Sequence, residues 1–253
     1  MLLAWIGAIA IGLSLGLLGS GGSIVTVPVL VYLVGQSEKV AIAGSLGIVG
    51  GIALVGALLY ARQRLVDWRS VLFFGLPGMV GTYGGAWLAK FVSGSAQLAV
   101  FAVVMLLASG LMFRTPARFQ NDRGERHVWK LGLDGVIVGI VTGFVGVGGG
   151  FLIVPALAVL GGLPMHRAVG TSLMIIALKS ASGFVKYLAV LSELDLEIDW
   201  SVIGLFLLFG IVGTFAGRAI GTRVPQPALK KAFALFLVPV AVFILWENLP
   251  QVL

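Results

Sequence analysis

Two glycine-rich runs could bring backbone N–H groups close to a bound anion. GLLGSGGSIVTVPVL spans residues 16–30, and GFVGVGGGFLIVPAL spans residues 143–157. Each glycine destabilises a helix interior by about 1 kcal/mol relative to alanine, but it lets the backbone bend sharply and lets another group approach closely. A helix that restarts after such a break presents unpaired N–H groups and the positive end of its dipole, which attract an anion. The predicted binding residues of the two runs are Gly21, Gly22, Ser23, Gly148, Gly149 and Gly150.

Neither run matches a phosphate-binding loop. No Lys-Ser/Thr pair follows the glycines, and neither run has the spacing G-x-G-x-x-G. The alternative to an anion site is that the glycines only allow close helix packing. We assign that packing role to the G-x-x-x-G pairs Gly81/Gly85 and Gly213/Gly217.

A lysine inside an apolar stretch is the next candidate. Lys179 falls about midway along residues 168–190, and Ile52 stands at the corresponding position of the first half of the chain. A charge at the centre of a membrane span costs roughly 2.5–3.5 kcal/mol or more. Lys179 therefore either attracts the anion, pairs with a carboxylate, or extends toward a surface.

Hydroxyl groups follow each glycine run, where the next apolar stretch begins. Ser45, Thr171 and Ser172 could bind an oxyanion, or they could cap or back-bond their own helices. His166 and Arg167 follow the sequence GGLP, and we expect them in a surface loop. The alternative for His166 is a role in proton coupling.

These candidates lie in a very apolar chain. Of its 253 residues, 59% are hydrophobic and 11% are charged, whereas about 25% are charged in a soluble domain. The chain is therefore an all-α polytopic membrane protein, because its apolar runs lack the alternation of barrel strands. The net charge of +7 comes mostly from short loops, so it indicates topology and not nucleic-acid binding. The apolar stretches are 2–34, 41–61, 70–89, 96–113, 131–160, 168–190, 200–220 and 228–246.

The chain contains one unit twice. With an offset of 127, residues 16–46 match residues 143–173 at twelve of thirty-one positions, and with an offset of 132, residues 67–85 match residues 199–217 at nine of nineteen. We divide the chain into a first membrane repeat (1–113), a basic cytoplasmic linker (114–130) and a second membrane repeat (131–253). Such duplication is typical of transporters. In both copies an Asp-Trp pair begins a span, with Asp67 and Asp199 as helix N-caps.

The distribution of basic residues favours inverted repeats. If each glycine-rich segment breaks and returns to its own side, three spans remain per repeat and the loops hold thirteen Lys and Arg residues on one side and three on the other. If all eight segments cross, the repeats are parallel and the split is nine against seven. Basic residues gather on the cytoplasmic side, so we predict inverted repeats with re-entrant first segments; eight full spans in parallel repeats are the alternative. Inversion would bring the two glycine breaks together near mid-membrane.

The doubled motif G-x-x-G-x-G-G-[SG]-x-x-x-V-P, followed by AIAGSL and AVGTSL, resembles the sulfite exporter TauE/SafE family, also called the TSUP permeases. The resemblance covers almost the whole chain. It implies a secondary transporter of the bacterial inner membrane that exports a small sulfur-containing anion such as sulfite or an organosulfonate. The family's thiosulfate-uptake branch is associated with functional cysteines, and this chain has none.

Two other functions fit the sequence less well. A transporter or channel for another small anion would use the same glycine runs and lysine. A membrane-embedded enzyme would need paired carboxylates or histidines within the spans, but nearly all acidic residues lie in loops or at span ends. We expect no catalytic residue, metal or cofactor, and the partners are the anion and the lipid bilayer, not nucleic acid. Because no ATP-binding motif is present, an ion gradient or the anion gradient must drive the flux.

Overall fold

The computed structural model describes residues 2–18, 22–114, 128–145, 153–154, 157, 163–221 and 225–248. In these ranges the chain is almost entirely helical and has no strand, which confirms the all-α prediction. The elements are α1 (Leu2–Leu18), α2 (Gly22–Pro28), η1 (Val29–Leu33), α3 (Glu38–Arg62), α4 (Trp68–Ser70), η2 (Val71–Gly75), α5 (Leu76–Leu88), η3 (Ala89–Phe91), α6 (Gly94–Arg114), α7 (Val128–Val145), α9 (Met165–Glu193), α10 (Trp200–Gly221) and α11 (Gln226–Asn248).

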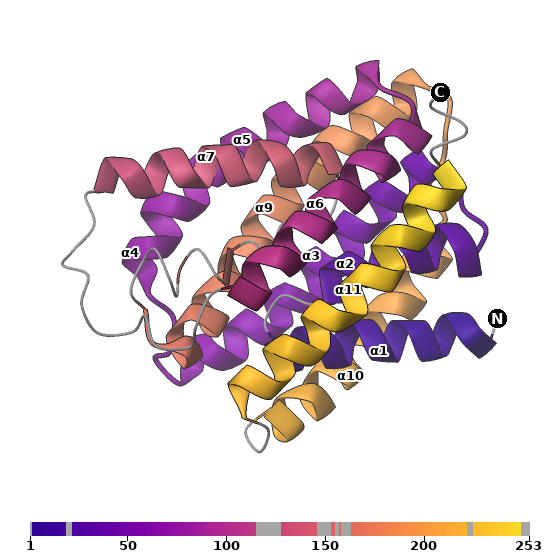
Figure 1. The fold of residues 1–253 in the computed structure, drawn as a ribbon. Helices are drawn as coiled ribbons and strands as arrows, with labels where there is room; N and C mark the ends of the chain where they lie inside the picture. Colours follow the sequence, from indigo (N-terminus) through magenta and orange to yellow (C-terminus); the bar gives the residue numbers. More distant parts are fainter. Residues whose placement is uncertain are drawn as a thin grey trace.

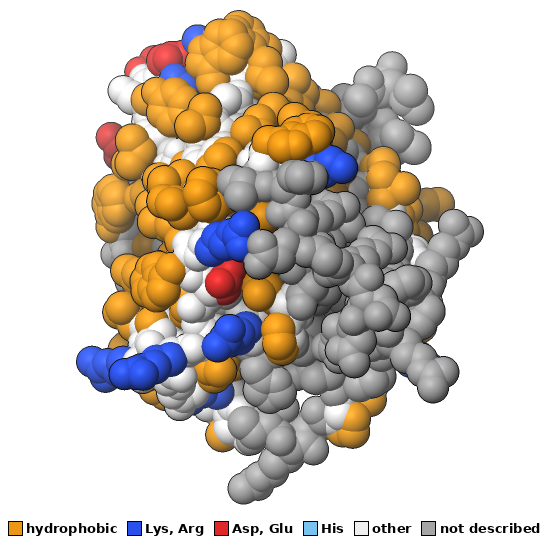
Figure 2. All heavy atoms as spheres, turned by 90° about the vertical axis from the view of Figure 1, so that its left-hand side faces the viewer, with side chains coloured by type: hydrophobic (Ala, Val, Ile, Leu, Met, Phe, Trp, Pro, Cys, Tyr) orange, Lys and Arg blue, Asp and Glu red, His pale blue; other side chains and the backbone are white. Residues whose placement is uncertain are grey.

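The long helices have the length and composition of membrane spans. Glu38–Arg62, Trp68–Phe91, Arg167–Glu193 and Trp200–Ile220 are each long and apolar enough to cross a bilayer. The helices α6 and α11, with 21 and 23 residues, also reach the length of about 20 residues that a span requires. Figure 2 shows hydrophobic side chains over much of the described part of one face. This is the kind of surface that lipid covers.

Two spans begin with the aspartate caps predicted from the sequence. The Asp67 carboxylate accepts a hydrogen bond from the Ser70 N–H at 2.9 Å. Asp199 accepts hydrogen bonds from the N–H groups two and three residues further on, at 2.9 and 3.2 Å. These bonds satisfy donors that a helix start leaves unpaired. The adjacent Trp68 and Trp200 are 60% and 61% exposed, as interfacial tryptophans are.

The helix α1 and the segment that begins at Gly22 run in opposite directions. Gly22 begins α2 beside Ile11 of α1, because a β-carbon on Gly22 would overlap the Ile11 carbonyl oxygen. Near the other end of the hairpin, a β-carbon on Gly7 would lie 3.0 Å from Cγ1 of Val29. The helix α1 and the α2–η1 segment are therefore adjacent and antiparallel, as two limbs of a helical hairpin.

The packing between helices repeats the duplication of the sequence. α1 lies along α10, where a β-carbon on Gly12 would overlap the carbonyl oxygen of Gly210. α7 lies along α5, where a β-carbon on Gly139 would overlap the carbonyl oxygen of Gly78. Gly139 is the counterpart of Gly12 at the offset of 127, and Gly210 is the counterpart of Gly78 at the offset of 132. The two contacts are therefore equivalent. Figure 1 shows the α1–α10 pair and the α5–α7 pair on different flanks of the bundle.

The corresponding helices α3 and α9 pack against each other in opposite directions. A β-carbon on Gly47 would lie 3.2 Å from the Phe184 ring, and one on Gly56 would lie 3.2 Å from Leu173. Rising numbers on α3 thus match falling numbers on α9, so the two helices are antiparallel. Each also packs against a helix of the other repeat, α3 against α10 and α9 against α5.

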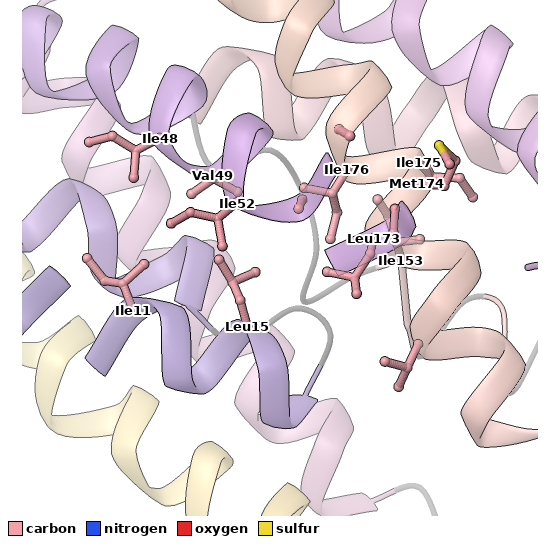
Figure 3. Packing of buried hydrophobic residues seen from close by; sticks show 14 of the residues in the cluster. Ile11, Leu15, Ile48, Val49, Ile52, Ile153, Leu173, Met174, Ile175 and Ile176 are labelled. Carbon is pink, nitrogen blue, oxygen red and sulfur yellow. The ribbon is translucent and has the colours of Figure 1, made fainter. Parts of the chain in front are cut away.

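Buried side chains from both repeats form one hydrophobic cluster between these helices. Figure 3 shows Leu15 of α1 beside Val49 and Ile52 of α3, and Ile153 beside Leu173 of α9. The cluster joins the first hairpin, both central helices and the second repeat into one packed unit. The predicted linker lies mostly outside the described residues, which stop at Arg114 and resume at Val128, so the division into repeats and linker stays a prediction.

The G-x-x-x-G pairs have the packing role predicted for them, and α5 offers a matched test. A β-carbon on Gly81 would overlap the Val136 carbonyl oxygen of α7, whereas one on Gly84 would meet no atom within 4 Å. We expect Gly81→Ala to lower the free energy of unfolding by about 1–3 kcal/mol, the usual effect of overpacking. We expect Gly84→Ala to raise it by up to about 1 kcal/mol, because alanine is the better helix former. Thermal melting in detergent measures both; equal melting temperatures would contradict the close α5–α7 contact.

Candidate functional site

The glycine runs are only partly described. Gly21, Gly148, Gly149 and Gly150 lie outside the described residues, whereas Gly22 and Ser23 form the buried first turn of α2. The Thr26 hydroxyl donates a hydrogen bond to the Gly22 carbonyl at 2.9 Å. The turn lies beside the part of α1 that contacts Gly210, the midpoint of α10. The N-terminus of α2 is therefore near the middle of the bundle.

Lys179 is fully buried. The exposed fraction of its side chain is 0%, so the ammonium group does not extend to a surface. Its Nζ donates to the Gly135 carbonyl of α7 at 3.4 Å and lies 4.7 Å from the centre of the Phe74 ring. Gly78 of α5 makes room for it, because a β-carbon there would overlap Cε of the lysine. Neither described contact of the ammonium group is a carboxylate.

The Lys179 pocket exists twice in the fold, but only one copy holds a charge. Ile52, the counterpart of Lys179, lies against Gly210, the counterpart of Gly78. A β-carbon on Gly210 would also lie 3.8 Å from the Ala8 carbonyl oxygen, which corresponds to the Gly135 carbonyl that Lys179 contacts. Equivalent residues of the two repeats thus line the two pockets. One pocket is filled by a lysine and the other by an isoleucine.

The buried hydroxyls of the predicted site bond within the protein. Ser45 donates to the Ile42 carbonyl at 3.0 Å, and Ser172 donates to the Val169 carbonyl at 2.8 Å. These are back-bonds to residue i−3, one of the two roles foreseen for them. The Thr171 hydroxyl accepts a hydrogen bond from the Asp67 N–H at 2.8 Å, which joins α9 to the start of α4. Their role as oxyanion ligands stays a prediction.

The predicted binding residues do not all gather at one place. Ser172 and Lys179 are seven residues apart on α9 and therefore share a helix face, about 10 Å apart along the axis. The described contacts of Lys179 are with α5, η2 and α7 and do not include Gly22 or Ser23. The lysine thus lies among α5, η2 and α7.

The last turns of α1 and α7 lie at different levels along α9. Near the end of α1, a β-carbon on Gly16 would lie 3.0 Å from the Arg218 nitrogen. The Arg218 guanidinium lies 5.3 Å from the centre of the Tyr60 ring, and Tyr60 packs on Gly170 of α9.

At the end of α7, the Phe144 carbonyl accepts a hydrogen bond from Tyr187 at 3.0 Å. Gly16 and Gly56 both lie against Thr214, and Gly56 lies against Leu173, whereas Gly143 and Gly183 both lie against Thr82. The two last turns are thus level with Leu173 and Gly183, which are ten residues or about 15 Å apart along α9. The two breaks themselves, at residues 19–21 and 146–150, lie outside the described residues, so their meeting near mid-membrane stays a prediction.

Two further features were missed or misplaced by sequence reasoning. His166 and Arg167 are not in a loop but in the first turn of α9, because Pro164 takes the N-cap position and the helix begins at Met165. Lys39 precedes the predicted stretch 41–61, but it lies in the first turn of α3 and is 9% exposed. Its ammonium group donates to the carbonyls of Ala89 and Val92. A basic residue directly before a predicted apolar stretch was the available signal.

A second buried polar group was also missed. Gln97 of α6 and Tyr187 of α9 are both 0% exposed and hydrogen-bond to each other and to the Phe144 carbonyl. Each residue alone looks like an ordinary member of an apolar helix. Only the packing of α6, α7 and α9 brings them together.

The fold and the buried charge together define a class of protein. A duplicated bundle of membrane-spanning helices, with a helical hairpin and a lysine in its interior, is the architecture of a multi-pass membrane transporter. Among the described residues, no group of three or more His, Asp or Glu side chains could hold a metal ion.

Comparison with known proteins names the family. Residues 4–244 match the family described as Sulfite exporter TauE/SafE, and the chain belongs to this family. It is 32% identical over 245 residues to a protein of Xylella fastidiosa (strain 9a5c) named "Probable membrane transporter protein", covering 94% of this chain and 92% of that protein. It is 29% identical over 246 residues to "Probable membrane transporter protein YunE" of Bacillus subtilis (strain 168), covering 87% of each. No solved structure matches the chain. The protein is thus a multi-pass membrane transporter and not an enzyme.

Gly22 tests the hairpin. Leucine at this position would force its side chain into the backbone of α1 at Ile11, so we expect Gly22→Leu to abolish transport while the protein still inserts in the membrane. The sequence predicts the same for Gly149→Leu. Flux in vesicles and the amount of protein in the membrane fraction are the measurements. Gly110→Leu is the control, because a β-carbon on Gly110 meets no atom within 4 Å. Normal flux in Gly22→Leu would show that the α1–α2 contact is dispensable.

Proposed function

We propose that this transporter exports a small sulfur-containing anion, such as sulfite or an organosulfonate, and that Lys179 supplies the positive charge that attracts it. The observation that carries the proposal is the buried ammonium group in the middle of α9, whose described contacts are a carbonyl oxygen and an aromatic ring. A buried charge without an opposite charge is expensive. An anion that enters the bundle would offset that energy.

The membership of the sulfite exporter family supports the sulfur-containing substrate and the outward direction. The start of α2 supports an anion site as well, because Gly22 and Ser23 begin a helix near mid-bundle. We propose that the glycine runs and the hydroxyls of Ser45, Thr171 and Ser172 complete the path of the anion. Transport of another small anion is the second candidate, since the same lysine would attract any of them.

We also propose that the two repeats are inverted, with both termini outside and residues 62–69 and 114–130 in the cytoplasm. The antiparallel packing of the corresponding helices α3 and α9 supports inversion. An ion pair supports it as well: Lys90 lies 3.3 Å from Glu193. Inverted repeats put both residues at the outer side, whereas eight full spans would put them on opposite sides of the membrane.

Cysteine labelling tests this topology, because the chain has no native cysteine. Ser192 and Gln63 are both exposed, near the ends of α9 and α3. We expect Ser192→Cys to react with an impermeant thiol reagent added outside the cell, and Gln63→Cys to react only when the reagent reaches the cytoplasm. Labelling of both from the same side would rule out inversion.

Lys179 tests the anion site. If Lys179 attracts the anion, Lys179→Met should weaken binding by about 1.5–3 kcal/mol, which is about a 10- to 150-fold loss of affinity. Lys179→Arg should keep part of the affinity, because the charge remains but the donor geometry differs. Sulfite, sulfate and a small sulfonate are titrated into purified wild type and variants, and thermal melting is followed in parallel.

Ile52→Met is the matched control for Lys179→Met, because Ile52 fills the uncharged copy of the same pocket. It should leave anion affinity unchanged. Unchanged affinity in Lys179→Met, with the protein still folded, would exclude Lys179 from the anion site. Tighter binding of sulfate than of sulfite or the sulfonate would favour the second candidate function.

A further inference from the structure

Two equivalent junctions lie toward opposite ends of the central helices α3 and α9. In each, a glycine of one central helix lies against a leucine of the other and against a threonine of α5 or α10. Their members are related by the offsets of 127 and 132: Gly56, Leu173 and Thr214 at the first junction, and Gly183, Leu46 and Thr82 at the second. A comparison of the two ends therefore shows what each repeat builds at the same place.

One helix turn beyond the first junction stands an arginine. Arg218 follows Thr214 by four residues on α10, and Tyr60 follows Gly56 by four residues on α3. The Arg218 guanidinium group lies 5.3 Å from the centre of the Tyr60 ring, which is a cation–π distance. Both residues are only partly buried. The ring thus holds the guanidinium group in place, but the bundle does not enclose it.

One helix turn beyond the second junction, the equivalent place is uncharged and sealed. Ala86 stands at the position of Arg218, and Tyr187 stands at the position of Tyr60. Both are 0% exposed. The Tyr187 hydroxyl accepts a hydrogen bond from the buried amide of Gln97 at 2.9 Å. The two ends of the bundle therefore differ, because one is closed by hydrogen bonds and the other carries a partly exposed cation.

The cations near the second junction are engaged in other contacts. Lys186 is next to Tyr187 in sequence, but its ammonium group lies 5.6 Å from the centre of the exposed Tyr83 ring. Lys39 donates to carbonyl groups at the end of η3. Arg218, in contrast, pairs with no carboxylate among the described residues.

The position of Arg218 connects it with the proposed path of the anion. Its backbone lies against the last turn of α1, at Gly16, where the first glycine run begins. Tyr60 packs on Gly170, which is nine residues before Lys179 on α9, or about 13 Å along the helix axis. The proposed topology puts the last turns of α3 and α10 at the cytoplasmic side. Arg218 would then lie between the cytoplasm and the buried lysine.

The chemistry of the guanidinium group fits an oxyanion. It has five N–H donors in a planar fork, which can bind two oxygen atoms of one anion at once. The aromatic ring restricts the motion of the side chain, so less freedom is lost when an anion binds. Arg218 is also in the last turn of α10, where a cation is stable before any anion arrives.

We propose that Arg218, positioned by the ring of Tyr60, is the capture site where this transporter takes up a sulfur oxyanion from the cytoplasm before the anion reaches Lys179. The inference rests on the proposed anion export. A cation at the cytoplasmic end raises the local concentration of anions and their rate of association. No arginine stands at the equivalent outer place, where Ala86 is found, to bind the anion again after release.

The experiment is a flux measurement in inside-out membrane vesicles that contain the full-length chain. Sulfite, sulfate and a small sulfonate are added to the cytoplasmic face, and initial rates give KM and kcat for each. We expect Arg218→Gln to raise KM at least about 10-fold, because a hydrogen bond to a charged group is lost. The value of kcat should change little, since the later steps are intact. Added salt should raise KM in wild type more than in Arg218→Gln.

Matched variants separate capture from a general effect of surface charge. Arg62→Gln removes the same charge from the end of α3, two residues after Tyr60, but Arg62 is exposed, so KM should change by less than about twofold. Arg218→Lys should restore part of the affinity, because the charge remains. Tyr60→Phe keeps the ring and should leave KM near the wild-type value, whereas Tyr60→Leu should raise it.

Melting temperatures of all variants are measured in parallel. Should Arg218→Gln fail to fold, the comparison of Tyr60→Leu with Tyr60→Phe decides, because only the loss of the ring should raise KM. An unchanged KM in folded Arg218→Gln, or an equal rise in Arg62→Gln, would overturn the capture site and leave anion export in place. If wild type transports none of the three anions, the proposed export fails and the capture site fails with it. The two failures are therefore distinguishable.

Discussion

Backbone lies directly against backbone where Gly12 meets Gly210 and again where Gly139 meets Gly78. A single β-carbon at any of these glycines would separate α1 from α10 or α7 from α5. In a bilayer no hydrophobic force drives helices together, because lipid is as apolar as their side chains, so close packing of small residues does much of this work. The remaining features depend on these two contacts, since they join the first helix of each repeat to the other repeat.

The duplicated contact also explains how the chain holds a charge in its interior. The α5–α7 contact and the α1–α10 contact create the same small pocket next to α9 and next to α3. One pocket is filled by Ile52 and the other by Lys179, and Gly78 provides the room for the longer side chain. A symmetric scaffold therefore carries an asymmetric electrostatic centre.

Other buried polar groups mostly find their partners within the protein. Ser45 and Ser172 donate hydrogen bonds to carbonyl groups of their own helices, and Lys39 donates to a carbonyl group of η3. Unpaired groups in hydrocarbon are expensive, so such satisfaction is the rule. Against that background, the lysine without a described carboxylate contact is an exception, and so are the unpaired oxygen atoms of Gln36, Gln97 and Ser180. Of these groups, Lys179 is the one where we propose that the anion binds.

The sequence alone determined the class of the protein, because hydropathy and the spacing of the glycine motif are local properties. It gave the all-α membrane fold, the duplication, the caps at Asp67 and Asp199, the packing of the G-x-x-x-G pairs and the family. It also picked out Lys179, because a charge in an apolar run is visible without coordinates.

The tertiary structure decided which residues meet. Gln97, Phe144 and Tyr187 are far apart in the chain, and no pattern links them until α6, α7 and α9 pack. The same holds for the walls of the Lys179 pocket and for the separation of the last turns of α1 and α7 along α9. Sequence periodicity fixes which face of a helix is apolar, but the crossing of two helices depends on close contacts such as Gly12 on Gly210, which only the assembled bundle defines.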